Sequence, residues 1–377
     1  MVSSVLLLVG ALLSGGRQPR GQREPRPFRW GPALSRYGYA LPFAGVAAVS
    51  AAYSPSPSLA WGSVAVLALM VIIFWLFVKD PVEPGTMPRF TRHWVFGAVV
   101  LAGAAISGFL QNRTYATTVF LGKNGLGTLL AMSLPLAHLE VLAASEPILA
   151  WAGVLLIATA LLLTMSQGGW VAAVVAELAL LLLGSSRMRR QVAILILVAG
   201  ILASSFALWA ADSRVPAYGM LLSRLDPGSS SKTERLLIWE GSWRMFRDHP
   251  WWGVGLGAFS AVYPDYRPPQ SREGNVSFAH NIILNLLAET GIFGLLGFTV
   301  IVAVWLGYGL RAVRRAKGEG RELPAALVAS LAAMLTHQLF DGTLWSLHIG
   351  VGFWLLGGML WMLGRAAGGR EEAVQHG

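Results

Sequence analysis

The sequence predicts an all-α fold: a polytopic membrane helical bundle of about ten or eleven spans, with one long extracytoplasmic loop that contains short interfacial helices. Of the 377 residues, 55% are hydrophobic and only 13% are charged, whereas a soluble domain carries about 25% charged residues. Apolar runs of about 20 residues, the length that crosses a hydrocarbon core of about 30 Å, recur along the chain. Because no repeat or low-complexity linker divides these runs, we expect residues 1–377 to form a single membrane domain.

Ten apolar segments are expected to span the membrane. Their approximate ranges are 36–53, 59–78, 94–110, 125–143, 147–164, 169–184, 192–211, 280–309, 324–342 and 345–364. Residues 2–13 are also apolar but short for a span. Residues 1–16 are therefore expected to be either a truncated first helix or a signal-like segment, which no small-residue cleavage motif follows.

The net charge of +10 orients these spans. In a soluble protein such an excess would suggest nucleic-acid binding, but here the basic residues gather in short connections, above all at 187–190 and 311–321. Short loops rich in arginine and lysine stay on the cytoplasmic side of a membrane. We therefore expect a protein of the cytoplasmic membrane, whose partner is the lipid bilayer and not nucleic acid. Facing the periplasm or the exterior would then be segments 111–124, 165–168, 212–279 and 342–346.

The large loop 212–279 differs from the other connections. It holds eight basic and seven acidic residues, and long loops cross the membrane largely regardless of charge. Loops of this length are usually functional. Four apolar residues recur in it at helical spacing: Leu236, Trp239, Trp243 and Phe246. This spacing predicts an amphipathic helix over 233–247, of the kind that lies in the membrane interface with tryptophan at headgroup level.

Polar residues occur where this loop returns to the membrane. His280 and Asn281 begin the next apolar segment. Asn281, Asn285 and Glu289 then follow at four-residue intervals, hence on one helical face. Such a stripe is costly against lipid and should face the protein interior or a wet cavity. His280 is a candidate general base, because an unperturbed imidazole titrates near neutral pH; the alternative is that His280 and Asn281 only cap the helix.

Charged residues supply further candidates. Arg235 lies on the predicted loop helix, away from its apolar stripe, where a guanidinium can bind phosphate through two hydrogen bonds. The alternative for Arg235 is a solvated face or a contact with a lipid headgroup. His337 and Asp341 are four residues apart near the outer end of a span and share a face. The carboxylate could orient a histidine or pair with an arginine of the loop, or the two residues could form a structural pair.

Several classes of site are excluded. The chain has no cysteine, which excludes disulfides, thiolate metal sites and cysteine catalysis. Lys123 and Asn124 lack the upstream glycine spacing and the hydroxyl residue of a phosphate-binding nucleotide loop. The glycines of 253–257 lack the preceding strand and the acidic partner of a dinucleotide fingerprint. The histidines are too dispersed for a metal site, so we expect neither a metal nor a cofactor.

Three motifs follow one another before and within the span at 280–309. They are RLLIW at 235–239, DHPWWGVGLGAF at 248–259 and HNIILNLLAETGIFG at 280–294. Two weaker ones precede them, GKNGLGTLLA from residue 122 and LTMSQGGW at 163–170. In order, spacing and position between spans, these motifs resemble the bacterial O-antigen ligase and polymerase superfamily. That resemblance covers about the last two thirds of the chain and implies a membrane enzyme that moves glycans from a polyprenyl diphosphate carrier.

The resemblance also implies roles for individual residues. His280 and Arg235 are similar to residues of the family's catalytic pocket, and Asp341 is similar to an acidic position late in the family. The substrate-binding candidates are Asn281, Glu289, Gln167, Lys123, Asn124 and Arg214. The family usually has Ser-Arg-Gly where this chain has Ser166-Gln167-Gly168, so one phosphate-binding arginine is replaced by an uncharged residue. The cations that could compensate are Arg113, Lys123, Arg214 and Arg224.

The leading hypothesis is metal-independent glycosyl transfer at the outer face of the membrane, as in an O-antigen ligase. The donor would be a glycan on polyprenyl diphosphate and the acceptor a glycolipid or glycan of the envelope. Arg235 would hold the diphosphate and His280 would accept the proton of the acceptor hydroxyl. Asp341 or Glu289 would orient His280. The alternatives are a polymerase of the same superfamily, a transporter or flippase of lipid-linked glycans, and a degenerate member that serves as a scaffold.

Overall fold

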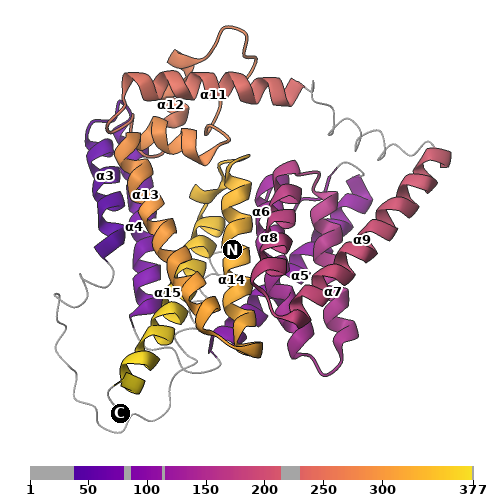
Figure 1. Ribbon diagram of the computed structural model, residues 1–377. Coiled ribbons are helices and arrows are strands. Elements are labelled where there is room, and N and C mark those ends of the chain that lie inside the picture. Colours follow the sequence, from indigo (N-terminus) through magenta and orange to yellow (C-terminus); the bar gives the residue numbers. More distant parts are fainter. Residues whose placement is uncertain (1–37, 80–85, 113–114, 214–229, 376–377) are drawn as a thin grey trace. The chain divides into compact units, whose positions relative to one another are not determined.

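The computed structural model describes residues 38–79, 86–112, 115–213 and 230–375. In these ranges the chain is helical and has no strand, which confirms the all-α prediction. Every one of the ten predicted spans coincides with a helix (Figure 1). The helices are η1 (Gly38–Ala40), α3 (Leu41–Ala52), α4 (Pro57–Val78), α5 (Thr86–Asn112), α6 (Lys123–Ala143), α7 (Pro147–Leu163), α8 (Gln167–Leu183), α9 (Ser186–Ser213), α13 (Ile282–Arg315), α14 (Glu322–Gln338) and α15 (Leu347–Gln375). Residues 1–16 lie outside the described ranges.

Hydropathy marks the chain as a multi-pass membrane protein. Among the described helices, α4, α5, α6, α13 and α15 are long and apolar enough to cross a membrane, whereas α7, α8 and the segment Gly38–Ala52 are apolar but shorter. Burial separates the long helices into two kinds. In the most apolar stretch of α6 and α15, 72% and 83% of the residues are buried, against 22% in α4 and α5. The first two are therefore central, and the other two present their apolar side chains to lipid.

The centre of the bundle is built on α14. It packs most extensively on α8 and α6, which also pack on each other. Beyond α14, α13 pairs with α15, and α3 and α4 cover that pair. Trp305 of α13 is fully buried there and contacts the rings of Phe74, Phe353 and Trp354. This arrangement brings the start of α6, the start of α8 and the end of α14 to the same end of the bundle.

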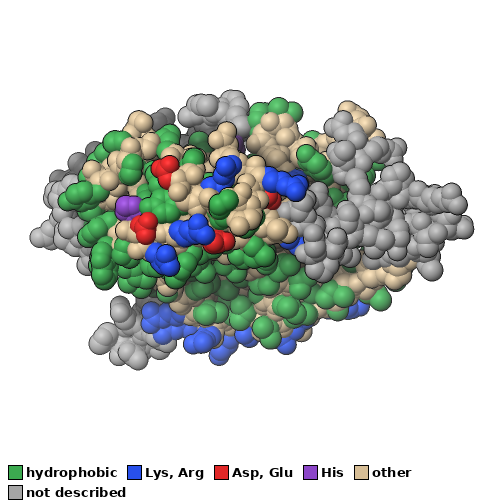
Figure 2. All heavy atoms as spheres, turned by 90° about the horizontal axis from the view of Figure 1, so that it is seen from above, with side chains coloured by type: hydrophobic (Ala, Val, Ile, Leu, Met, Phe, Trp, Pro, Cys, Tyr) green, Lys and Arg blue, Asp and Glu red, His purple; other side chains and the backbone are tan. Residues whose placement is uncertain are grey.

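The large loop contains two further helices and a core of its own. They are α11 (Ser230–Asp248) and α12 (Phe259–Tyr266), and α11 confirms the helix predicted over 233–247. A hydrophobic cluster joins Ile238 of α11 and Phe259 of α12 to Ala288 of α13. The apolar stripe predicted for α11 is partly exposed, since Leu236 is 61% exposed and Trp243 is 48% exposed, whereas Ile238 and Met245 are buried. Figure 2, which looks onto this side of the molecule, shows hydrophobic side chains among basic and acidic ones.

A break in α13 anchors the loop. Gly291 has φ +65° and ψ −166°, so the helix is interrupted there. The carbonyls of Ala288 and Glu289 accept hydrogen bonds from the amides of Val254 and Gly255, at 2.9 Å each, and the Ile292 amide donates to Pro250. Backbone groups freed inside a membrane helix need such partners. A Cβ at Gly291 would collide with the backbone of Trp251, which accounts for glycine at this position.

Basic residues gather at the end of the bundle away from α11. Arg187, near the start of α9, pairs with Glu319 in the turn before α14 at 2.6 Å and with Glu322, the first residue of α14, at 3.4 Å. His337 lies in the last turn of that same helix. At 1.5 Å per residue, Glu322 and His337 are separated by about 22 Å along α14. Arg187 and its partners therefore lie at the opposite end of α14 from His337.

Candidate active site

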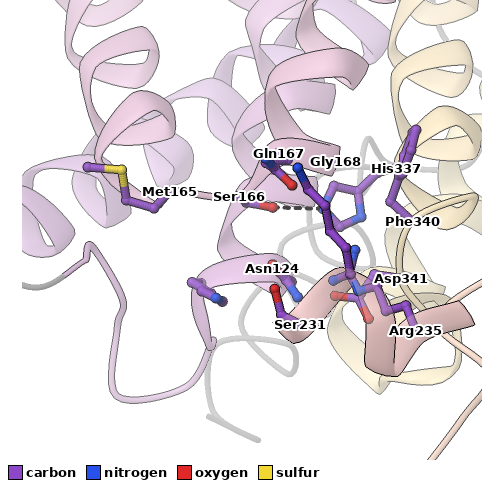
Figure 3. Close-up of a pocket in the computed structure, with 12 residues that line it drawn as sticks. Asn124, Met165, Ser166, Gln167, Gly168, Ser231, Arg235, His337, Phe340 and Asp341 are labelled. Carbon is purple, nitrogen blue, oxygen red and sulfur yellow. Dashed lines mark hydrogen bonds between the residues drawn. The ribbon is translucent and has the colours of Figure 1, made fainter. Parts of the chain in front are cut away.

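A polar pocket lies where the N-terminal ends of α6, α8 and α11 meet the C-terminal end of α14. Its lining residues are Lys123, Asn124, Met165, Ser166, Gln167, Gly168, Ser231, Lys232, Arg235, His337, Phe340 and Asp341. Figure 3 shows these side chains gathered around one space, from segments more than 200 residues apart in sequence. Five residues predicted for the site are brought together here: Lys123, Asn124, Gln167, Arg235 and Asp341.

The pocket has the electrostatic character of an anion site. Lys123, Lys232 and Arg235 line it, and the first amides of a helix carry partial positive charge because they have no partner within the helix. Within the described ranges no hydrogen bond or ion pair engages the partly buried Arg235. Its planar guanidinium is therefore available to two oxygens of one ligand. Cations at helix N-termini suit phosphate groups.

Beside the anion site, Asp341 holds His280. Oδ1 of Asp341 lies 2.9 Å from Nδ1 of His280 and accepts a second hydrogen bond from the Gly342 amide at 2.8 Å. The Asp341 side chain is 3% exposed and that of His280 is 24% exposed. Because a carboxylate only accepts, this contact assigns the proton of neutral His280 to Nδ1 and leaves the Nε2 lone pair for a substrate. His280 does not line the pocket itself but adjoins it through Asp341.

Backbone strain occurs on both sides of the pocket. His280 has φ +51° and Met165, in the turn before α8, has φ +52°. The left-handed region is uncommon for residues other than glycine and costs free energy. The imidazole of His280 packs against the ring of Phe278, and the two ring centroids are 4.8 Å apart. Strain of this kind is concentrated at functional sites, where the surrounding structure holds it.

Comparison with known proteins identifies part of the chain. Residues 152–299 match the family described as O-antigen ligase. Over this segment the chain is similar to that family. The family indicates glycan transfer of the ligase or polymerase type, and the match confirms the resemblance seen in the motifs. It includes Gln167, Arg235 and His280, whereas Lys123 and Asp341 come to the same site from outside it. No curated protein matched the chain.

Within the O-antigen ligase segment, Asn281 caps α13. Its Oδ1 accepts hydrogen bonds from the amides of Ile283 at 3.0 Å and Leu284 at 3.2 Å, and its Nδ2 donates to the carbonyl of Leu339 at 3.2 Å. The cap also ties the start of α13 to the end of α14. The capping alternative therefore describes Asn281, while the side chain of His280 is turned to Asp341.

Asn285 and Glu289 of the same segment support the large loop. Asn285 accepts from the Ala279 amide and donates to Glu289, at 2.9 Å in both cases. The other oxygen of Glu289 accepts from the Phe259 amide at 3.2 Å. Neither residue lines the pocket described above. Of the two carboxylates expected to orient His280, Asp341 makes the contact and Glu289 instead holds the loop.

The other predicted residues, and one residue that the sequence analysis missed, have different outcomes. Arg214, Arg113 and Arg224 lie outside the described residues. Sequence reasoning missed Lys232, although its spacing of one helical turn before Arg235 was a usable signal. His337 was weighed as a partner of Asp341, but its ring nitrogens contact Thr128 and Ser166. In the described ranges, no group of three or more histidine and acidic side chains has the arrangement of a metal site.

Proposed function

We propose that this chain transfers a glycan from a polyprenyl diphosphate carrier to an envelope acceptor at the outer face of the cytoplasmic membrane, as an O-antigen ligase does. The observation that carries the proposal is the juxtaposition of an anion site, which contains Arg235, with the Asp341–His280 pair. Glycosyl transfer needs both parts, because charge develops on the leaving diphosphate while the acceptor hydroxyl must lose its proton.

The reaction follows from these positions. The acceptor oxygen attacks the anomeric carbon of the donor sugar, and its proton passes to Nε2 of His280. Asp341 stabilises the imidazolium that forms. The bond from the anomeric carbon to the diphosphate oxygen breaks, and its electron pair stays on the diphosphate, where Arg235 and Lys232 balance the added charge. His280 then returns its proton to solvent. A single displacement of this kind inverts the configuration of the anomeric carbon.

Charge distribution supports placing the pocket on the outer face. The described helices carry Arg187, Arg189 and Arg190 near the start of α9 and Arg314 and Arg315 in the last turn of α13. These ends lie away from the pocket, and short basic connections stay cytoplasmic. The lipid tail of the donor would then lie in the outer leaflet while its diphosphate reaches the pocket.

A reconstituted transfer assay tests the proposal. Purified protein receives a defined glycan on undecaprenyl diphosphate together with a lipid A core acceptor, and the product is followed by mass spectrometry. We expect transfer by the wild type, none by His280→Ala, and strongly reduced transfer by Arg235→Ala. The matched control is Arg244→Ala, on the same helix, where Arg244 pairs with Glu240 outside the pocket. Equal transfer by His280→Ala and the wild type would remove the base assignment.

The same assay separates ligase from polymerase. A ligase elongates the lipid A core in one step, whereas a polymerase needs a second lipid-linked repeat as its acceptor. We expect product on the lipid A core when that is the only acceptor. Product that forms only between two lipid-linked repeats would assign the chain to the polymerase branch of the superfamily.

The alternative to an enzyme is a transporter or flippase, and a buried pair of polar side chains on α6 and α8 allows a test of it. His138 of α6 and Glu177 of α8 lie 3.2 Å apart, both buried, and neither lines the pocket. Polar pairs within spans are typical of transport pathways. Scrambling of a lipid-linked glycan across vesicle membranes, lost in His138→Ala and retained in His280→Ala, would favour a flippase over an enzyme.

A further inference from the structure

His337 joins three parts of the pocket wall. It lies in the last turn of α14 with 1% of its surface exposed. Its Nδ1 lies 2.9 Å from Oγ1 of Thr128 on α6, and its Nε2 lies 3.3 Å from Oγ of Ser166 at the start of α8. Figure 3 shows the contact with Ser166 at the edge of the pocket. The proposed reaction leaves this buried imidazole without a role.

The hydroxyl of Thr128 determines which nitrogen of His337 carries the proton. A hydroxyl has one hydrogen to donate, and Thr128 donates it to the Asn124 carbonyl at 3.0 Å. Thr128 must therefore accept from Nδ1–H of His337. It also lies 3.1 Å from the hydroxyl of Thr343, which accepts from Gln338 and so has its own hydrogen to donate. Nε2 of His337 is then an acceptor, and the Ser166 hydroxyl donates to it.

This hydrogen bond orients the cap of α8. Ser166 is the N-cap residue, and its Oγ accepts from the Gly169 amide at 3.3 Å. With its hydrogen directed to His337 and an acceptor site occupied by Gly169, the hydroxyl has one orientation. The preceding residue, Met165, is in the left-handed region, so the turn needs such support. The amides that open α8 are thereby held toward the pocket.

The imidazole is packed against the start of α8. A Cβ on Gly168 would lie 3.0 Å from Cβ of Phe340 and 3.5 Å from the ring of His337, so the start of α8 rests directly on the end of α14. Asp341 follows His337 by one helical turn and holds His280. His337 thus lies between the start of α8, which faces the proposed diphosphate, and Asp341, which holds the proposed base His280.

We propose that His337 is a positioning residue: as a neutral imidazole it links Thr128 to Ser166 and thereby fixes the direction in which the N-terminus of α8 meets the donor diphosphate. The inference rests on the proposed function for the identity of the ligand. It concerns the binding of diphosphate rather than proton transfer, so its effect falls on donor affinity and on the KM of the donor.

Two substitutions separate the nitrogens of His337. In His337→Gln the terminal amide reaches the place of Nε2 and its oxygen can accept from Ser166. In His337→Asn the amide occupies the place of Nδ1, which retains the contact with Thr128 and loses that with Ser166. We expect His337→Gln to stay within about 3-fold of the wild type in donor KM, and His337→Asn to raise it about 10-fold or more, with a smaller change in kcat. Ser166→Ala should match His337→Asn.

The double variant shows whether His337 acts through Ser166. If it does, Ser166→Ala combined with His337→Asn raises the donor KM no further than either change alone. A merely structural histidine predicts equal losses in His337→Gln and His337→Asn, or additive losses in the double variant, and either result overturns the proposal. Size-exclusion profiles and thermal unfolding of each variant identify any that fail to fold, and for those Thr128→Val replaces the histidine change, with Thr128→Ser as the conservative rescue.

Binding without turnover keeps this test independent of the proposed function. Farnesyl diphosphate serves as the probe, and its Kd is measured by tryptophan fluorescence in the wild type and in a His280→Ala background. We expect the same order in both backgrounds: His337→Gln near the reference, His337→Asn and Ser166→Ala weaker. If the wild type transfers no glycan but keeps this order, the proposed function falls and the positioning role stands. Equal Kd values for His337→Gln and His337→Asn contradict the positioning role alone.

Discussion

Oδ1 of Asp341 lies 2.9 Å from Nδ1 of His280, a residue 61 positions earlier in the chain. The contact joins the turn after α14 to the start of α13, and the hydrogen bond that Nδ2 of Asn281 donates to the Leu339 carbonyl joins the same two ends a second time. A buried carboxylate that accepts a hydrogen bond from Nδ1–H leaves Nε2 as the basic nitrogen of the pair. The base of the proposed reaction is therefore set by a helix–helix contact.

Removing the charge of Asp341 tests this pair. We expect Asp341→Asn to lower kcat by about 10²–10⁴-fold, because the amide neither stabilises an imidazolium nor enforces the Nδ1–H tautomer. Donor KM should change less than kcat, since the cations that line the pocket are retained. Single-turnover rates with saturating lipid-linked donor measure the effect, with Asp248→Asn on the exposed end of α11 as the control. An unchanged kcat in Asp341→Asn would separate His280 from its assigned role.

A second prediction concerns the effect of a positive charge at position 167 on donor binding. Gln167 lines the pocket at the first position of α8, where the resemblance to the O-antigen ligase family implies an arginine. We expect Gln167→Arg to lower donor KM by about 3–10-fold and to steepen its dependence on ionic strength. Gln167→Glu should shift KM in the opposite direction. Steady-state kinetics at two salt concentrations measure these changes in donor KM. A change of the same sign in both variants would argue against an anion bound beside residue 167.

Glu289 is expected to matter for stability more than for chemistry. Glu289→Ala leaves the Phe259 amide and the Asn285 amide without their acceptor, at a cost of about 1–3 kcal/mol for each buried group. Thermal unfolding in detergent should show a lower Tm, with donor KM retained in the protein that remains folded. Glu240→Ala, which removes an exposed i,i+4 pair on α11, should leave Tm nearly unchanged.

The contact between Glu234 of α11 and residues 271–272 of the large loop is expected to weaken at acid pH. The Arg272 amide donates to Glu234 at 3.0 Å and lowers the pKa of that carboxyl below 4.5, and the Ser271 hydroxyl at 2.9 Å acts in the same direction. A depressed pKa means that the contact stabilises the fold above pH 4.5 and is lost as pH falls through the lowered value. Hydrogen exchange of residues 267–278 should therefore quicken below about pH 4.5, after correction for intrinsic rates.

Glu234→Gln provides the control for that measurement. Its amide oxygen still accepts one hydrogen bond, but the residue cannot titrate. Exchange in the variant should be faster than in the wild type at pH 6 and should show no further transition between pH 6 and 3. A transition of the same size in both proteins would assign the acid sensitivity to other carboxyls of the loop.

Local sequence patterns determined the helices and the residues that bear chemistry. Long apolar runs can satisfy their backbone groups in a membrane only as helices, and so the ten spans were predictable one at a time. The three- and four-residue spacing from Leu236 to Phe246 located α11, because residues at that spacing share one face of a helix. Arg235 and His280 stood out by their motifs, without any knowledge of their neighbours.

Tertiary structure decided how those residues are combined. Asp341 rather than Glu289 orients His280, because the end of α14 meets the start of α13. Lys123 joins Arg235 because the starts of α6 and α11 line one pocket. His337 lies 171 residues from Ser166 and 209 from Thr128, and no periodicity encodes contacts at such separations. Helix spacing places a side chain on a face; only the packing of α14 against α6 and α8 determines what that face meets.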